Sequence, residues 1–423
     1  MASVKHAGKA GASYLLSFLK WAAVGVGVGC IVGLAGVGFA YTMQLVTAAR
    51  TAVPLLVLGL PLCGAAIVFL YHRAGVRNSR GTNLVLLSVR SEEDIPLRMA
   101  PLIFIGTALT HLFGGSAGRE GAALQLGGSI AQNLGKLLKM NKKELHVVTM
   151  AGMSACFTAL FGTPLTATVF AMEVVSVGAM YYSALVPCAT ASVTAYAVAT
   201  LCGLPPERFA ITGIPEAFSP LTALRVGALA ALAALVSILF CVTLKYTGKL
   251  YKKWFSNAYI KAAVGGVIIA ALSLLLYALT GKFAFNGAGM DVVAAALDGQ
   301  ADGYAFLLKI LFTALTLEAG FKGGEIVPTF YIGSTFGCFA GPFLGLPPSF
   351  SAALGLMSLF CGVTNCPITS IFLSLELFGG EGLLWYLLSA AVSYMLSGYF
   401  GLYSQQKILY SKELPEFIDA TCK

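Results

Sequence analysis

The chain has 423 residues, of which 58% are hydrophobic and only 11% charged, and its formal net charge is +9. Soluble globular proteins carry about 25% charged residues, so this composition, with a mean hydropathy of +0.83, excludes an ordinary soluble domain and predicts a polytopic membrane protein. Lys and Arg concentrate in short loops at 71–80, 136–146 and 245–253. This follows the positive-inside rule for cytoplasmic loops. No soluble basic module is recognisable, so we expect no nucleic-acid partner.

Apolar runs that approach the length of a membrane-spanning helix follow one another along the chain. They cover residues 21–49, 53–71, 221–243, 262–280 and 383–400, and a spanning helix needs about 20 residues. Because the hydrocarbon core holds no water, such runs must be helices that satisfy their own backbone groups. The N-terminal stretch resembles a signal peptide, but its apolar character continues past Lys20 to about residue 49. We interpret it as a retained membrane helix.

The ten cysteines lie mostly in apolar segments, where they behave as small hydrophobic residues. Cys361 and Cys366 form the one close pair, and their spacing matches no zinc or redox motif. We therefore assign no metal site, no cofactor and no catalytic residue.

The two halves of the chain resemble each other. The segments "FGTPLTATVFAMEV" (161–174) and "VTNCPITSIFLSLEL" (363–377) each place a Thr two positions and a Glu nine positions after a proline. The residues are Pro164, Thr166 and Glu173 in one half, and Pro367, Thr369 and Glu376 in the other. Upstream, glycines lie nine apart in both halves, at 118 and 127 and at 324 and 333. We predict a duplicated bundle with a first membrane repeat at 1–205 and a second at 206–423, one integral unit without a cytoplasmic domain.

Three segments place Gly or Pro directly before a short apolar stretch. They are "RGTNLVLLSV" (80–89), "GREGAALQLGG" (118–128) and "GGEIVPTFYIGSTFG" (323–337). A helix that starts at such a break leaves unpaired N–H groups and a partial positive charge at the break. Three convergent helix starts would bind a small anion without using an Arg or Lys. Transporters with internal repeats build their sites in this way.

These segments, in this order, resemble the CLC family of chloride channels and anion/proton antiporters. The segments "GREG" (118–121) and "GGEIVP" (323–328) match its most specific motifs, and "GLYSQQKIL" (401–409) resembles its final helix, whose tyrosine touches the central anion. The departures from the chloride members include Asn83 in the first box, Ala122 after "GREG", and Val174 in place of an inner glutamate. In the later box they are Glu325, Ile326 and Val327. This combination resembles the fluoride/proton antiporter branch of bacterial CLC proteins.

The resemblance implies an all-α polytopic membrane protein, a CLC-type inverted-repeat bundle with interrupted and re-entrant helices. It implies a homodimer in the inner (plasma) membrane of a bacterium. The implied function is fluoride export from the cytoplasm in exchange for protons, which would protect the cell because HF diffuses inward and dissociates. The alternative is a chloride channel or a chloride/proton exchanger of the same family. A remote alternative is an intramembrane serine hydrolase, since residues 114–118 match the pattern G-x-S-x-G around Ser116.

Two acids and one amide are the principal candidates for the transport site. Glu120 is the expected protonatable gate, because a charged carboxylate can occupy an anion site that a neutral one leaves. The alternative is a structural ion pair with Arg119. We expect Glu325 to take part in proton or fluoride passage, the alternative being stabilisation of a helix dipole. Asn83 would donate amide hydrogens to the anion or cap a helix.

The remaining candidates complete an anion path. Tyr403 offers a phenolic donor, although a tyrosine at the membrane interface is the alternative. The other residues assigned to anion binding are Thr82, Gly118, Gly121, Ile326, Val327, Phe330 and Tyr331. Intramembrane acids are usually functional, but the symmetric placement of Glu173 and Glu376 favours a shared structural role, such as capping a re-entrant helix.

Overall fold

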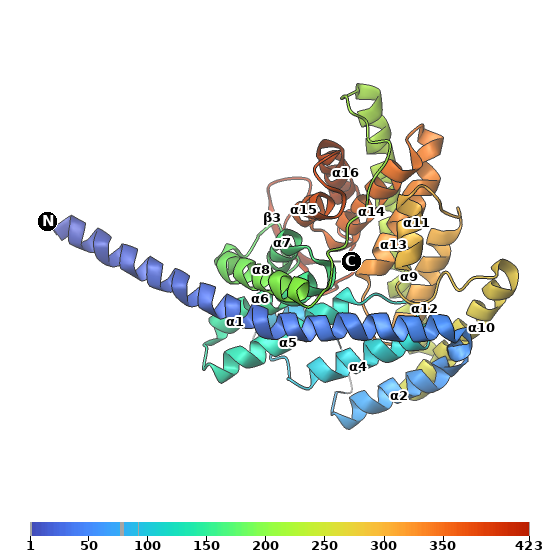
Figure 1. Cartoon of the computed structure of the whole chain (residues 1–423), viewed down its shortest axis with the longest axis horizontal. Helices are drawn as coiled ribbons and strands as arrows, with labels where there is room; N and C mark the ends of the chain where they lie inside the picture. Colours follow the sequence, from blue (N-terminus) through green and yellow to red (C-terminus); the bar gives the residue numbers. More distant parts are fainter. Residues whose placement is uncertain (1, 77–79, 92, 423) are drawn as a thin grey trace.

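The computed structural model describes residues 2–76, 80–91 and 93–422, with side chains from residue 12 onward. In this part of the chain, eight α-helices precede a connecting segment and eight follow it (Figure 1). The first eight are α1 (Ala2–Ala52), α2 (Leu60–Arg73), α3 (Thr82–Arg90), α4 (Met99–Leu112), α5 (Glu120–Leu137), α6 (Lys142–Phe161), α7 (Pro164–Glu173) and α8 (Leu185–Leu201). The second eight are α9 (Pro220–Trp254), α10 (Ala258–Thr280), α11 (Met290–Leu297), α12 (Ala305–Ala319), α13 (Ile326–Ala340), α14 (Pro348–Thr364), α15 (Pro367–Phe378) and α16 (Leu383–Leu396).

Six helices of the described chain are long and apolar enough to cross a membrane. Four of them contain the predicted runs at 21–49, 53–71, 221–243 and 262–280, and the second of these begins with the 3₁₀ turn Pro54–Gly59. The run at 383–400 forms only the shorter helix α16. The spans Lys142–Phe161 and Tyr182–Leu201 were not predicted, because Ser, Thr and Gly dilute their apolar character. The prediction of a multi-pass helical membrane protein is confirmed.

The first helix is continuous from the N-terminus, and its beginning projects away from the bundle (Figure 1). Lys20 forms an ion pair with Glu144 at the start of α6. Glu144 also belongs to a capping box, in which it accepts from the Asn141 N–H at 2.9 Å and donates its own N–H to the Asn141 side chain at 3.1 Å. The capping box fixes the start of α6.

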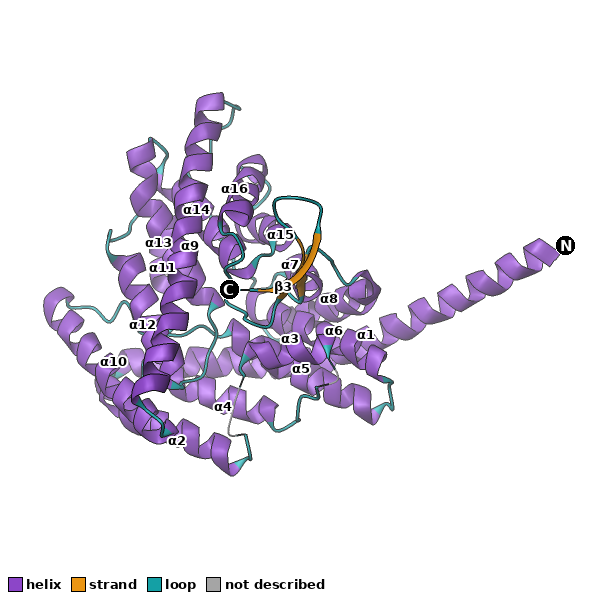
Figure 2. Cartoon of the chain, turned by 180° about the vertical axis from the view of Figure 1, so that it is seen from behind, coloured by secondary structure: helices purple, strands orange, loops and turns teal. Residues whose placement is uncertain are grey.

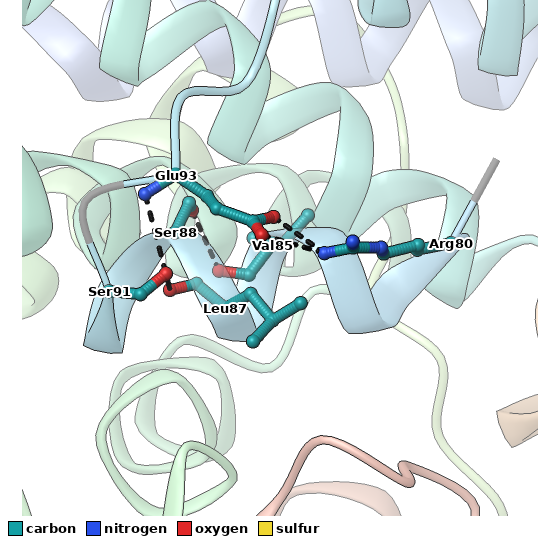
Figure 3. Close-up of polar contacts among 6 residues, drawn as sticks. All are labelled: Arg80, Val85, Leu87, Ser88, Ser91 and Glu93. Atoms are coloured by element: carbon teal, nitrogen blue, oxygen red, sulfur yellow. Dashed lines mark hydrogen bonds and ion pairs between the residues drawn. The ribbon is translucent and has the colours of Figure 1, made fainter. Parts of the chain in front are cut away.

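The predicted basic loops lie on one side of the molecule. Residues of the first and third loops line the same cavity. Arg80, from the first loop, pairs with Glu93 across α3 (Figure 3), and the neighbouring Asp94 pairs with Lys136 of the second loop at 3.1 Å. Residues 77–79 of the first loop lie outside the described residues. A shared side is the arrangement that the positive-inside rule requires.

The predicted repeat is visible in the backbone of two equivalent turns. Helix α6 ends at Gly162 with φ 68°, and α14 ends at Asn365 with φ 57°, so both use the left-handed conformation. The next residues, Thr163 and Cys366, share φ −117° and ψ 75°, and each precedes the proline that starts a helix. Proline at the first helical position needs no N–H partner. The two turns therefore share their backbone conformation residue for residue.

The predicted glycines nine residues apart bring helix backbones into contact. A Cβ on Gly127 of α5 would overlap the carbonyl oxygen of Gly152 in α6, and one on Gly333 of α13 would lie 2.6 Å from the carbonyl oxygen of Gly355 in α14. Close backbone approach through small residues is typical of helix pairs in membranes.

Glu173 and Glu376 each cap a helix start in the opposite half of the chain. The carboxylate of Glu173 accepts hydrogen bonds from the Ile368 N–H (3.1 Å), the Thr369 N–H (2.8 Å) and the Thr369 hydroxyl (2.5 Å). The carboxylate of Glu376 accepts the equivalent three, at 2.9, 2.8 and 2.6 Å, from the first turn of α7. The preference for a structural role is confirmed.

The chain ends in strands, so the final helix expected at 401–409 is wrong. Strand β2 (Lys407–Tyr410) pairs parallel with β1 (Ser176–Val177) and antiparallel with β3 (Phe417–Thr421), as the short strands in Figure 2 show. The Gln406 side chain donates to the carbonyls of Val174 (2.9 Å) and Thr364 (2.7 Å). The backbone of β2 can pair with β1 and β3 because an extended strand has free N–H groups, whereas a helix would use its N–H groups internally.

Replacing either capping acid tests the reciprocal caps. We expect Glu173→Gln and Glu376→Gln each to lower the free energy of unfolding by about 1–3 kcal/mol, because each loses charge-assisted hydrogen bonds. The check is the thermal unfolding midpoint of detergent-solubilised protein, with the exposed Glu381→Gln as the matched control. Midpoints equal to that of Glu381→Gln would contradict the capping role.

Candidate functional site

Three short-range breaks in the chain become three helix starts that meet. Helix α3 begins at Thr82 after Gly81, whose φ of 57° and ψ of −141° suit only glycine. Helices α5 and α13 begin directly after Arg119 and Glu325. The Thr82 hydroxyl lies 3.4 Å from the Gly121 carbonyl oxygen, so the first turns of α3 and α5 touch. The predicted convergence of these segments is confirmed.

The two glycine boxes, one from each half, bind each other through their backbones. The Gly118 N–H donates to the Gly324 carbonyl at 2.7 Å, and the Gly324 N–H donates to the Gly118 carbonyl at 2.8 Å. A Cβ on Gly118 would lie 2.9 Å from Cδ of Pro328, and one on Gly121 would lie 3.0 Å from Cα of Gly324. Glycine is therefore required because the two backbones run side by side.

Glu120 is fully buried at the junction of α5 and α13. Its Oε2 accepts hydrogen bonds from the backbone N–H of Arg119 (3.0 Å) and of Val327 (3.1 Å). Its Oε1 has no hydrogen-bond partner among the described residues. The carboxylate thus lies where an anion would bind, on N–H groups at helix starts from both halves.

The ion pair between Arg119 and Glu120 that the alternative requires is present, but Arg119 has a shorter contact elsewhere. The Arg119 guanidinium donates to Glu207 in the connecting segment at 2.7 Å. Its Nε lies 3.7 Å from Oε1 of Glu120, beyond hydrogen-bond distance. Arg119 is therefore held mainly by Glu207, a partner that the sequence analysis missed because the two residues are far apart in the chain.

Asn83 lies in the first turn of α3, where it contacts the segment that contains Tyr403. The Asn83 side-chain oxygen accepts the Gln405 N–H at 3.0 Å, which leaves the amide NH₂ group for other partners. Asn83 does not cap α3, because Gly81 holds the cap position and no side chain bonds there. Tyr403 is 1% exposed, so it is no interface tyrosine, and its hydroxyl has no hydrogen-bond partner within the described chain.

The remaining residues predicted to line the anion path fall into two groups, one near Glu120 and one away from it. Ile326 and Val327 are fully buried at the start of α13, and the Phe330 ring one turn later lies 6.0 Å from Phe161. The Tyr331 ring instead lies near Phe285 and the Lys309 ammonium, outside the contacts that join the others. A path-lining role for Tyr331 stays a prediction without support from these contacts.

A cavity of about 810 Å³ connects this junction to the side of the molecule that carries the basic loops. Asn83, Gln125 and Glu325 line it. Oε2 of Glu325 has no hydrogen-bond partner in the described structure and would lie 3.2 Å from a Cβ on Gly121. The Gln125 amide donates to the Gly121 carbonyl at 3.0 Å. Sequence reasoning missed Gln125, although a glutamine one turn into an otherwise apolar helix start was a visible signal.

Comparison with known proteins identifies the family. The sequence profile of the voltage-gated chloride channels matches residues 63–398. The chain belongs to the CLC family. A chloride/fluoride channel protein of Pseudomonas syringae pv. tomato is 33% identical to this CLC protein over 94% of the chain and 89% of the relative. An H⁺/Cl⁻ exchange transporter of Vibrio cholerae is 25% identical over 83% of the chain and 80% of the relative.

Solved structures give the same family and fold. The crystal structure of a CLC-type fluoride/proton antiporter matches with a TM-score of 0.86 and 33% identity, over 92% of this chain and 98% of that one. A slow cyanobacterial Cl⁻/H⁺ antiporter shares the fold, with a TM-score of 0.77 and 19% identity over 89% of this chain and 94% of that one. This CLC protein is a multi-pass helical membrane protein whose relatives include anion channels and anion/proton antiporters. The remote hydrolase alternative finds no support, because the Ser116 hydroxyl pairs with Thr313 at 3.2 Å.

The paired glycine boxes can be tested by adding one methyl group. A Cβ on Gly324 would overlap the Gly121 N–H, so we expect Gly324→Ala to separate the boxes and lower anion transport at least about tenfold. Gly227→Ala in α9 is the matched control, because its Cβ would meet open space. Anion flux from proteoliposomes and the unfolding midpoint are the measurements. Equal flux in the two variants would argue against the pairing.

Proposed function

We propose that this CLC protein is a fluoride/proton antiporter that exports fluoride, with Glu120 as its protonatable gate. The observation that carries the proposal is the Glu120 carboxylate, which accepts N–H groups from helix starts in both halves of the chain. In its charged form this carboxylate fills the anion position. In its protonated form it has lost the charge that holds it there, and the N–H groups become available to a transported anion. The charged carboxylate and a transported anion therefore compete for one position, which links the protonation of Glu120 to anion binding.

Fluoride is the proposed anion because it is small and strongly hydrated, so a binding site must replace its water with good hydrogen-bond donors. The Asn83 amide NH₂ and the Tyr403 hydroxyl are candidate donors, since neither has a protein acceptor within the described residues. Thr82, Ile326, Val327 and Phe330 complete the proposed path, and Gly118 and Gly121 supply its backbone. The solved fluoride/proton antiporter that is 33% identical supports this choice, whereas the name of the Pseudomonas syringae relative gives both chloride and fluoride.

Glu325 is proposed to carry protons or to assist fluoride between the cavity and Glu120. Its carboxylate lines the cavity with one oxygen unpartnered in the described chain. Gly121 lies beside Glu325, and the preceding helix residue is Glu120 itself. A charge inside a membrane is costly to insert, by about 2.5–3.5 kcal/mol at a helix centre, so an acid with one carboxylate oxygen left unpartnered favours a transport role over a structural one.

The proposal extends to the cellular setting. We propose two repeats at 1–205 and 206–423, a homodimer, and the bacterial inner membrane, where fluoride export would detoxify the cytoplasm. Purified protein in liposomes tests the function directly, with fluoride, chloride and pH electrodes. Fluoride efflux that drives proton movement in the opposite direction is expected. Equal chloride and fluoride fluxes, or downhill fluoride flux without protons, would favour the chloride or channel alternatives.

The gate assignment predicts the behaviour of one neutral variant. Glu120→Gln removes the charge that competes with the anion and the group that takes up protons, so we expect coupled proton movement to be abolished. The pH electrode in the liposome assay measures this. The exposed Glu216→Gln is the control and should exchange like the unmodified protein. Normal coupled exchange by Glu120→Gln would refute the gate.

The second acid predicts a separate outcome. We expect Glu325→Gln to slow fluoride-coupled proton flux. Its unfolding midpoint should equal that of Glu216→Gln, because Oε2 of Glu325 accepts no hydrogen bond that the substitution could remove. Proton and fluoride fluxes measured together distinguish the cases. A lower midpoint with unchanged flux would make Glu325 a structural acid at the start of α13.

A further inference from the structure

We infer that Lys322 forms a docking site for a monovalent inorganic anion in the cavity, which the anion occupies before it reaches the helix starts. The inference rests on the proposed anion transport but is independent of which halide is carried. The inference gives a role to the lysine of the cavity wall that lies nearest in sequence to Glu325. Three observations support it: the position of Lys322, its lack of a protein counter-ion, and the charge of the cavity around it.

Lys322 is fixed close to the transport site. It lies three residues before Glu325, in the turn between α12 and α13, and both residues line the cavity. Its backbone N–H donates to the Thr110 hydroxyl at 3.1 Å, and its Cγ would lie 2.9 Å from a Cβ on Gly106. Because the Gly118–Gly324 pairing holds the next residues, the Lys322 backbone cannot move away from the site.

The Lys322 ammonium has no hydrogen-bond acceptor among the residues that the structure describes. It lies 4.5 Å from the centre of the Tyr71 ring, and no hydrogen bond or ion pair reaches it from the described residues. A ring face stabilises a cation by about 0.5–2 kcal/mol but accepts none of its three N–H groups as a carboxylate would. Those donors therefore face the cavity, where an anion or water must bind them.

The cavity as a whole is positive. Its basic lining residues come from four different parts of the chain and are His72, Arg80, Lys245, Lys249, Lys252, Lys261 and Lys322, whereas its acids are Glu318 and Glu325. Lys245, Lys249 and Lys252 repeat at helical spacing, which brings like charges onto one face of α9. A cleft lined by one sign of charge concentrates ions of the other sign.

Lys322 differs from these outer lysines in its surroundings. Lys245, Lys249 and Lys252 are exposed, so salt screens them beyond about 10 Å. Lys322 is partly buried against Tyr71 and Gly106, where screening is weaker. The outer lysines thus attract anions toward the cavity, and Lys322 holds one next to Glu325 and Asn83.

Variants at Lys322 test the docking site in proteoliposomes. Lys322→Met keeps the apolar stem and removes the charge, and Lys322→Arg keeps the charge. At contact distance, even in bulk-water dielectric, a unit charge strengthens anion binding about fivefold. We expect Lys322→Met to raise KM for the transported anion by about this factor, with little change in maximal rate. Lys322→Arg should stay near the unmodified value, and the rise should shrink at high concentrations of a non-transported salt.

The control is Lys253→Met, because Lys253 neighbours a lining lysine on α9 but is exposed and does not line the cavity. An unchanged KM in Lys322→Met overturns the inference, as does a loss of maximal rate alone or an equal KM in the Met and Arg variants. Each assay is run with fluoride and with chloride. If the protein moves chloride rather than fluoride, the proposed function fails, yet the KM for chloride still decides whether Lys322 docks the anion.

Discussion

Backbone N–H groups at a helix start have no acceptor within their own helix, and a membrane offers no water to replace one. This chain places helix starts inside the bundle and supplies carboxylates from elsewhere as acceptors. Glu173 and Glu376 each accept three hydrogen bonds, so both oxygens are satisfied. Glu120 accepts two through one oxygen, and the other oxygen accepts no hydrogen bond in the described chain and lies 3.7 Å from Nε of Arg119. The three acids therefore share one way of satisfying a helix start and differ in how fully their own oxygens are hydrogen-bonded.

Local patterns predicted the positions at which helices begin. Gly, Pro and Glu at fixed offsets act within a few residues, so the starts of α3, α5 and α13 and the duplicated turns followed from the chain alone. The capping role of Glu173 and Glu376 followed from their symmetry. What could not be predicted was the identity of each partner, because Gly118 binds Gly324 across two hundred residues and Arg119 binds Glu207 of the connecting segment. Such pairs depend on how the halves fit together.

Residue type alone did not decide several roles. Tyr403 and Tyr331 are both buried, yet the first lies two residues before Gln405, which bonds Asn83, and the second lies beside Lys309. The expected final helix is instead an extended segment, because its backbone pairs with β1 and its Gln406 side chain joins both halves. The basic loops were a sign of topology in the sequence. In the structure, residues from two of them also form the cavity wall.

The contact between Asn83 and Gln405 has a consequence for biosynthesis. Asn83 is synthesised before the N–H group that its side chain accepts, which is added 322 residues later. Strand β1 is likewise synthesised before its partner β2. Contacts of such sequence separation form late, after the local helices have formed. The helices of the first half can therefore enter the membrane before the segment that contacts Asn83 exists.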